Sequence, residues 1–471
     1  MQGSFQTRPE FPLAWRGIMT NKHRMLLLVL VLAASAVWGQ TERRIYSVET
    51  QRQWREWVFP TGLLEFNPDG SFSLRKYEDE IDAVADAQQF THIGAKDAEL
   101  QGGIWKVGST APGTNARNVL RPEGWWKPDP NAPIEDWLIE VNLGRLVAVH
   151  TLRFTFPDTV GARPLGDFRI FVTRGQREVS GENVFAYNVL GGTTEFNTRR
   201  VLEFKLEELR NLTDVVGETG DTAVEVADPE PFQQIQYIRI RADSKNEDAA
   251  IQQIEAFAFG ENVSLGAIER GGNMLELTGR GSVMVDGDIN TGWQQILSIP
   301  GVRLEWILDL GARFWVRRIY MLGAEHRSNR VGDMQVDHEL LISDQTSKVQ
   351  PKDLDLELLT ELDTTEQPGG KNDLQYFLPT PVAMRYLSAR YVGGRNGDMA
   401  ELVVVPTGHV AGAQLESGFI DLGQIAGDRR VKQITAIKWD SVEPEGTQVR
   451  VRTRTGFDLT EQVDYYKKDG T

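Results

Sequence analysis

The 471-residue sequence predicts an all-β protein of the sandwich or jelly-roll type. Short runs such as 168–172 and 237–241 alternate apolar and polar residues, which places one face of a strand in a core and the other in water. Forty-five glycines and 20 prolines supply turns between these runs, roughly every ten residues. Long amphipathic helical stretches are scarce. The same order of strands also occurs twice along the chain, so two sandwiches are expected.

Composition excludes several classes of function. The formal net charge of −16 disfavours nucleic acids and anionic membranes, because affinity for phosphates rests on cationic side chains. The chain has no cysteine, which excludes disulfides, thiolate zinc sites, iron–sulfur clusters and cysteine nucleophiles. A single core rarely grows past about 250–300 residues, so two or three domains are expected.

The first 39 residues predict a secretory signal peptide. Basic residues at 22–24 precede an apolar run that begins at Met25, and small residues follow at Ala34, Ala36 and Gly39, which is the pattern of such signals. A signal anchor or a buried helix is the alternative. The run is shorter than the roughly 20 residues of a membrane span, and no later segment reaches that length. We therefore expect a secreted or cell-surface protein with no membrane insertion of the mature chain.

An internal repeat divides the rest of the chain. The segment 137–145, ending in Leu-Gly-Arg, reappears as 306–313, ending in Leu-Gly-Ala-Arg. In each copy apolar residues follow the glycine at the same spacing, and then come a strand, a polar stretch, a tyrosine-containing strand and a closing strand led by glutamate. This order predicts two homologous units, at 101–260 and 261–408.

The second unit contains the motifs Asp286-Gly-Asp288, Thr291-Gly-Trp293, Trp306 to Gly311, Arg385-Tyr-Leu and Glu401-Leu. By these motifs it resembles a discoidin domain, the coagulation factor type C family within the galactose-binding-like jelly rolls. The first unit resembles this family more loosely. The resemblance implies tandem eight-stranded antiparallel sandwiches, glycan or other cell-surface binding by the loops at one end, and a structural calcium ion.

β-rich flanks are predicted on both sides of the repeat. Residues 40–100 hold strands at 54–59, 63–66 and 72–74 and are expected to pack on the first unit, because about sixty residues seldom sustain a core of their own. Residues 409–471 are expected to form a partial third β module, similar to the opening half of a module of large exported bacterial proteins. A complete sandwich needs about 100 residues, so further modules of a longer protein are expected partners.

The loop after residue 285 is the candidate calcium site. Asp286, Asp288 and Thr291 place oxygen-bearing side chains around a glycine turn, and Ca²⁺ takes six to eight oxygen ligands. The family resemblance adds Glu401 from the closing strand. The alternative is a turn in which the aspartates hydrogen-bond to their own backbone. In the first unit Arg121 stands where an aspartate is needed, so calcium is expected in the second unit alone, although Glu255 matches Glu401 in order.

Two groups of residues are candidates for ligand contact. Trp125 and Trp126 are adjacent, so only one can face inward on a strand, and the other could stack on a sugar ring. An arginine- and amide-bearing loop could hydrogen-bond to sugar hydroxyls or a carboxylate, and a solvated loop is the alternative. Core packing is the expectation for Trp137, Trp293 and Trp306. The loop residues are Arg327, Asn329 and Arg330.

The motifs of common enzymes are missing. The six histidines are scattered, and the chain has no nucleophile elbow, Walker loop or dinucleotide fingerprint. With 67 acidic residues in the chain, pairs of carboxylates occur at every spacing, so spacing does not identify a catalytic pair. We expect an exported, non-catalytic protein that binds carbohydrate or cell-surface ligands. The alternatives are an accessory binding region of a longer secreted carbohydrate-active enzyme, or a structural scaffold at the cell surface.

Overall fold

The computed structural model divides into two compact units, Glu49–Gly418 and a smaller one formed by the two ends of the chain. The expected signal peptide, 1–39, lies outside the residues that the structure describes. None of the described helices is long and apolar enough to cross a membrane. The described residues are 44–179, 181–206, 232–276, 279–294, 305–323, 338–346, 348–362, 373–391, 398–427 and 432–456.

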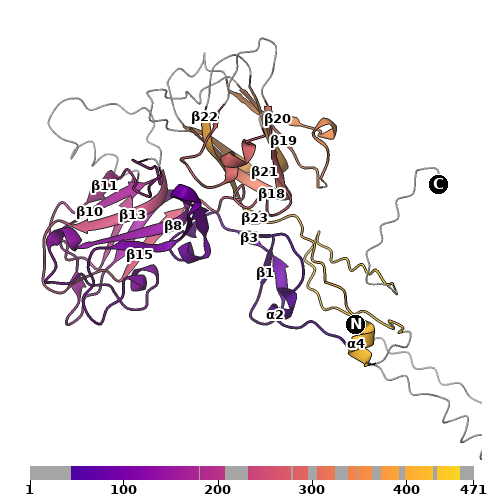
Figure 1. Cartoon of the computed structure of the whole chain (residues 1–471), viewed down its shortest axis with the longest axis horizontal. Coiled ribbons are helices and arrows are strands. Elements are labelled where there is room, and N and C mark those ends of the chain that lie inside the picture. Colours follow the sequence, from indigo (N-terminus) through magenta and orange to yellow (C-terminus); the bar gives the residue numbers. More distant parts are fainter. Residues whose placement is uncertain are drawn as a thin grey trace, which may run out of the picture. The chain divides into compact units, whose positions relative to one another are not determined.

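An eight-stranded antiparallel sheet, called the first sandwich below, is built around one long strand, β8 (Figure 1). β8 pairs with β7 and β13 over its first half and with β12 and β15 over its second half. The strand order is β11-β10-β13-β8-β15-β4. Its strands are β4 (Ile81–Asp82), β7 (Gly103–Val107), β8 (Leu138–Thr155), β10 (Phe168–Thr173), β11 (Asn188–Gly192), β12 (Val201–Lys205), β13 (Gln233–Ala242) and β15 (Gln253–Ala258).

A second antiparallel sheet, called the second sandwich, repeats this topology around β18. Its order, β17-β22-β18-β21-β19-β20, places β22, β18, β21, β19 and β20 where the first sheet has β15, β8, β13, β10 and β11. The strands are β16 (Asn273–Leu275), β17 (Trp293–Gln294), β18 (Glu305–Gly323), β19 (His338–Ser343), β20 (Glu357–Leu362), β21 (Asp373–Tyr391) and β22 (Asp398–Pro406).

The all-β architecture predicted from the sequence is therefore confirmed. The count of eight strands per sandwich is not. The first sheet reaches eight only with β4, which comes from the N-terminal flank, and the described residues of the second sheet form seven strands.

The Leu-Gly repeat has a structural cause. Gly144 and Gly311 have φ angles of 74° and 78°, a region that side chains other than glycine rarely adopt. A Cβ at Gly144 would lie 2.7 Å from Cβ of Phe90, and one at Gly311 would lie 2.7 Å from Cβ of Arg270. Each glycine therefore lets its long strand bend where the neighbouring chain comes closest.

Alternating apolar side chains fill a core in each sandwich. Trp137 is buried in the first core, and Trp293 and Trp306 are buried in the second, as the sequence predicts. The most deeply buried side chains of the first core include Ile139, Leu152, Phe154, Phe168, Ile238 and Ile254, and those of the second include Leu308, Phe314, Ile319, Leu387, Leu402 and Val404.

A third apolar cluster lies where the two sandwiches meet. In β22, Leu402 and Val404 point into the second core, whereas Val403 and Val405 point the other way and pack against the first sandwich. The rings of Phe232 and Tyr320 meet edge to face in this cluster, with centroids 5.3 Å apart. Its buried members are Leu146, Ala148, Phe232, Tyr320, Leu322, Val403 and Val405.

The N-terminal flank contacts both sandwiches, not the first alone. Ala83 and Val84 belong to the first core, whereas Leu63 and Tyr77 belong to the second. The expected hairpin forms as β1 (Leu64–Phe66) and β2 (Phe72–Leu74). The strand expected at 54–59 does not form. Thr50 and Gln53 make a capping box that starts helix α2 (Gln51–Trp54), and of the residues after it Val58 makes an isolated β-bridge with Glu416.

Small paired strands complete the unit Glu49–Gly418. β3 pairs with β23, β5 with β6, and β9 runs parallel to β14. These strands are β3 (Lys76–Tyr77), β5 (Thr91–Ile93), β6 (Glu99–Gln101), β9 (Arg163–Pro164), β14 (Ala249–Ala250) and β23 (Gly408–His409), and the 3-10 helices are η1 (Ala87–Gln89), η2 (Ala95–Asp97), η3 (Ala116–Leu120), η4 (Ile134–Asp136), η5 (Gly281–Val285) and η6 (Pro351–Asp353).

The C-terminal flank differs from the expectation of a partial β module. The flank begins with His409 of β23, and its next named element is helix α4 (Leu422–Ala426), capped by Asp421. The described stretch 432–456 contains no strand, although alternating runs at 434–439 and 446–455 predict two. Most of its side chains are exposed, and an alternating segment forms a stable strand only when a neighbour takes its hydrogen bonds and apolar face.

Candidate functional site

The acidic loop of the second sandwich runs from Asp286 to Thr291, between η5 and β17. Gly287 has a φ of 79° and makes the turn. Asp286 Oδ1 accepts the backbone N–H of Asp288 at 2.9 Å, and Asp288 Oδ1 accepts the backbone N–H of Asn290 at 3.0 Å. The turn with self-bonded aspartates that the sequence offered as an alternative is thus present, and it also gathers further oxygens.

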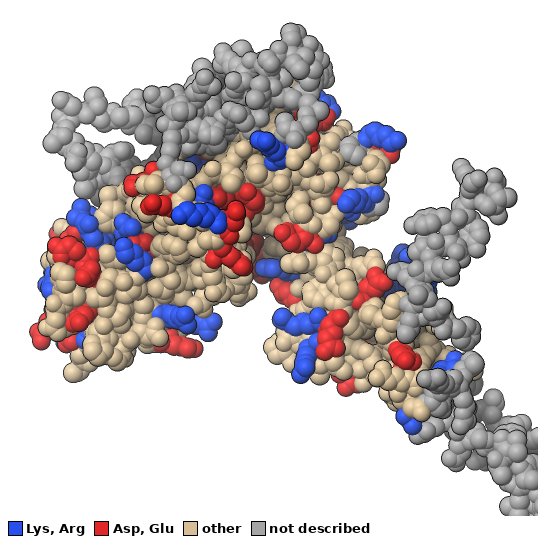
Figure 2. Space-filling model, in the orientation of Figure 1, with Lys and Arg blue, Asp and Glu red and all other residues tan. Residues whose placement is uncertain are grey.

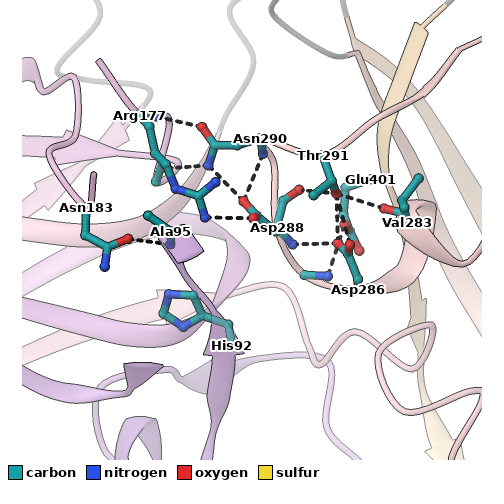
Figure 3. Close-up of polar contacts among 12 residues, drawn as sticks. His92, Ala95, Arg177, Asn183, Val283, Asp286, Asp288, Asn290, Thr291 and Glu401 are labelled. Carbon is teal, nitrogen blue, oxygen red and sulfur yellow. Dashed lines mark hydrogen bonds and ion pairs between the residues drawn. The ribbon is translucent and has the colours of Figure 1, made fainter. Parts of the chain in front are cut away.

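Oxygen atoms converge on the Thr291 hydroxyl (Figure 3). Its Oγ1 lies 3.0 Å from Oδ2 of Asp286, 2.9 Å from the carbonyl oxygen of Asp288 and 3.4 Å from that of Val283. Glu401, at the start of β22, accepts the N–H of Gly287 through Oε2 at 3.2 Å. One hydroxyl hydrogen cannot serve three acceptors, so at least one of these oxygens receives no hydrogen from Thr291.

Of the two carboxyl groups of this cluster, that of Glu401 is buried and that of Asp286 is half-buried. Glu401 is 1% exposed, and its Oε1 has no hydrogen-bond partner. Burial raises the pKa of Asp286 to about 6. Burial, and then the charge of Asp286, raises the pKa of Glu401 well above its usual value. An orphaned buried oxygen beside a second carboxyl group is an arrangement that a cation would stabilise.

The oxygen atoms of this cluster are of the kinds that calcium binds. Ca²⁺ accepts carboxylate, hydroxyl and carbonyl oxygens together in flexible geometry, and Asp286, Thr291 and Glu401 supply the first two kinds while Val283 and Asp288 supply carbonyls. The described residues contain no group of three or more His, Cys, Asp or Glu side chains placed to hold a metal. The candidate site therefore depends on two carboxylates and on neutral oxygens.

Asp288 takes a different part from the one its position in the motif indicates. Its carboxylate turns away from Thr291, and Oδ2 forms an ion pair of 2.7 Å with the guanidinium of Arg177, from the first sandwich. Asp288 thus offers its backbone carbonyl to the oxygen cluster and its side chain to the other sandwich. The sequence does not indicate that Arg177 pairs with Asp288, because the two residues are 111 positions apart and Arg177 belongs to no motif.

Two more polar groups lie near Asp288, one on β5 and one on β13. His92 hydrogen-bonds through Nε2 to the hydroxyl of Tyr237 at 2.9 Å. Burial lowers the pKa of His92 to about 4, against the opposing charge of Asp288. His92 is therefore neutral at pH 7, and Arg177 supplies the positive charge that pairs with Asp288.

In the first sandwich, the described stretch that corresponds to the acidic loop contains Arg121, which is exposed, and no Asp-Gly pair. Counting from the repeated glycines, Thr155 corresponds to Leu322. Leu322 pairs with Glu401, whereas Thr155 pairs with Gln253. Gln253, and not Glu255, therefore occupies the position of Glu401, and the match of Glu255 by order along the chain was wrong.

The two adjacent tryptophans separate as strand alternation predicts. Trp126 is 1% exposed, belongs to the first core and donates from Nε1 to the carbonyl of Ser109 at 3.1 Å. Its assignment as a ligand-contacting residue is wrong, because no face of its ring is available. Trp125 is half-buried and remains a candidate. The other predicted ligand residues, Arg327, Asn329 and Arg330, lie outside the described residues.

Charge is mixed on the visible surface. On the face shown in Figure 2, acidic and basic side chains are interspersed over the described residues and form no broad patch of one sign. A nucleic-acid interface normally shows a continuous basic stripe. This face offers none.

Comparisons with known proteins give distant matches. No family model matches the chain, and no curated protein matches it. Similar solved structures include a family 32 carbohydrate-binding module of Clostridium perfringens NanJ in complex with galactose, which is 16% identical, covers 28% of this chain and 90% of that chain, and has a TM-score of 0.23. A fucolectin from striped bass (Morone saxatilis) serum is 12% identical, with 71% and 99% covered and a TM-score of 0.26. Allantoicase from Saccharomyces cerevisiae is 12% identical, with 70% and 93% covered and a TM-score of 0.27. At these levels the neighbours assign no ligand or activity to this chain.

Proposed function

We propose that the chain is an exported, non-catalytic protein that binds carbohydrate through loops of its sandwiches, with a calcium ion held by the second. The observation that carries the proposal is the oxygen cluster of Asp286, Thr291 and Glu401. It joins the loop and the closing strand that the discoidin resemblance pairs, and it contains a buried oxygen without a partner. In this proposal the cation stiffens the loop, and neighbouring loops bind the ligand.

The expected ligand contacts are weak individually. An exposed aromatic face stacks on the apolar side of a sugar ring, and Trp125 is a half-buried tryptophan of the first sandwich. Arg327, Asn329 and Arg330 remain candidates for hydrogen bonds to sugar hydroxyls. With two sandwiches on one chain, the second binding event is intramolecular and occurs at a high effective concentration. The overall affinity would then exceed that of either sandwich, which suits glycans displayed repeatedly on a surface.

Calcium is expected to raise the melting temperature of the full chain. At a free concentration of 100 times Kd, a ligand of the native state adds about 2.7 kcal/mol to the free energy of unfolding. Thermal unfolding in calcium and in chelator measures this difference. Asp286→Asn and Glu401→Gln should each abolish most of it. Asp158→Asn, which alters an exposed ion pair with Arg163, should preserve it. Equal melting of the unmutated chain in calcium and in chelator would remove the cation from the proposal.

Glycan binding is tested with the full chain on a glycan array and on whole cells. Retention on a defined set of glycans is expected. Trp125→Ala or Arg330→Ala is expected to weaken it about tenfold, which corresponds to 1.4 kcal/mol. Trp315→Ala is the matched control, because Trp315 is an exposed tryptophan (45%) on β18 outside the candidate loops. Absence of retention on both supports would contradict carbohydrate binding.

A further inference from the structure

The two sandwiches meet through an apolar face that each presents. Tyr320, Leu322, Val403 and Val405 of the second sandwich are all buried, although they point away from its own core. Leu146, Ala148 and Phe232 of the first sandwich complete this cluster. Apolar surface of this kind drives association in water, so the two sandwiches are joined by packing as well as by the chain.

A polar clamp lies at the acidic loop. Besides its ion pair with Asp288, Arg177 donates its backbone N–H to Oδ1 of Asn290 at 2.7 Å. Asn290 donates from Nδ2 to the carbonyl of Gly175 at 2.9 Å. The side chains of Arg177 and Asp288 are 14% and 7% exposed. Three polar contacts therefore tie residues 175–177 to residues 288–290. Water competes weakly for the Arg177–Asp288 ion pair, whereas Asn290 is exposed.

The clamp and the cation cluster share one residue. The carboxylate of Asp288 is held by Arg177 on one oxygen and by Asn290 on the other, while its carbonyl oxygen lies 2.9 Å from Oγ1 of Thr291. Fixing the side chain restricts the peptide group that follows it. The position of one candidate cation ligand thus depends on a side chain of the other sandwich.

We propose that Arg177 is a positioning residue for the Asp286–Thr291 loop, so that cation binding to the second sandwich and docking of the first stabilise each other. This inference rests on the cation site of the proposed function and is independent of the glycan ligand. Coupling between two binding events is reciprocal and typically changes affinity 5- to 150-fold.

Substitution of Arg177 has two opposing effects on Ca²⁺ affinity. Whether the affinity rises or falls therefore shows which effect is larger. Removing the guanidinium leaves Asp288 unpaired, and the added negative charge attracts a divalent cation more strongly. Removing it also frees the loop, so that ordering the loop must be driven by the cation itself. Positioning predicts weaker binding after the substitution, whereas a purely electrostatic role predicts tighter binding.

The test is calorimetric titration of the full chain with Ca²⁺. Arg177→Gln is expected to raise Kd at least about fivefold, and Arg177→Lys is expected to raise it too, because a lysine keeps the charge but loses the planar fork. Arg174→Gln is the matched control. Arg174 forms an ion pair of 2.6 Å with Asp373, which also joins the sandwiches but does not touch the loop. The Kd of Arg174→Gln for Ca²⁺ should stay within about twofold of that of the unmutated chain.

A second measurement reports the docking itself. Since the chain has no cysteine, spin labels can be placed at Lys106→Cys in β7 and Glu357→Cys in β20, both exposed. Ca²⁺ should narrow the distribution of distances between the labels in the otherwise unmutated chain, and Arg177→Gln should remove most of this narrowing. If Arg177→Gln does not fold, Arg177→Lys serves for both measurements, because a role through charge alone predicts unchanged Ca²⁺ binding and unchanged narrowing in that variant.

The outcomes are distinct. Unchanged or tighter Ca²⁺ binding by Arg177→Gln overturns the positioning role and leaves the cation site standing. An equal loss in Arg174→Gln overturns the assignment to Arg177, because docking in general would then control affinity. Absence of any Ca²⁺ binding by the unmutated chain removes the cation site, and the coupling with it.

Discussion

Replacing Arg145 by methionine is expected to lower the free energy of unfolding of the chain by about 3–5 kcal/mol, the usual effect of removing one partner from a buried ion pair. Arg145 is 1% exposed. It donates from Nε to Glu261 at 2.9 Å and from Nη2 to Asp86 at 3.1 Å. Methionine fills most of the space but leaves the carboxyl group of Glu261 buried without its charge partner.

Glu261 decides how large this effect becomes. Burial raises the pKa of Glu261, and the charge of Arg145 opposes the rise. Without Arg145 the carboxyl group must bind a proton or admit water. Asp86 is partly exposed and can be solvated instead. The double variant Arg145→Met/Glu261→Met should therefore recover much of the lost stability, since an apolar pair can replace a buried ion pair at little cost.

Urea denaturation followed by far-ultraviolet circular dichroism measures these differences. Arg163→Met is the matched control, because its ion pair with Asp158 is exposed and such pairs contribute at most about 1 kcal/mol. An Arg145→Met chain as stable as the unmutated one would contradict the role of this pair. A double variant less stable than Arg145→Met would contradict the explanation through Glu261.

The fold class was predictable because strand alternation is a local property. Successive side chains of a strand point to opposite faces, so the runs around 168–172 and 237–241 identify β10 and β13 without knowledge of their partners. The repeated Leu-Gly pair was informative for a similar reason, since Gly144 and Gly311 each have a positive φ where another segment approaches closely. Both signals come from what the backbone at one position requires.

The errors arose where partners decide the structure. The sequence match paired Glu255 with Glu401 because each glutamate begins the apolar run of its closing strand. The strand pairing places Gln253, two residues earlier, opposite the β8 residue that corresponds to the partner of Glu401. The alternating runs at 434–439 and 446–455 predict strands, but the described stretch 432–456 contains none. Register and pairing depend on the neighbouring strand, which a single sequence does not reveal.

The candidate site was also predictable only in its local part. The motif identified Asp286, Thr291 and Glu401, and the structure brings these three together. Their role in binding a cation stays a prediction. The motif could not indicate that the carboxylate of Asp288 pairs with Arg177, because that contact depends on how the two sandwiches pack.

The adjacent tryptophans provide a second large and selective effect. Trp126→Ala is expected to lower the free energy of unfolding by about 3–5 kcal/mol, the range for deleting a large aromatic side chain from a core. Its ring lies in the first core, and its backbone forms an antiparallel bridge with Ile251. Alanine leaves a cavity there, and the carbonyl of Ser109 loses the N–H that it accepts.

Trp125→Ala serves as the control one residue away. Trp125 is half-buried, and its contact with Asn118 is made through its backbone carbonyl, which alanine retains. A loss of about 1 kcal/mol or less is expected. Circular dichroism suits both measurements, because removal of a tryptophan alters fluorescence directly. Equal losses of unfolding free energy in the two variants would contradict the conclusion that only Trp126 is buried in the core. If Trp125→Ala leaves stability nearly unchanged yet lowers glycan retention, the half-buried ring acts on the ligand, since the fold does not need it.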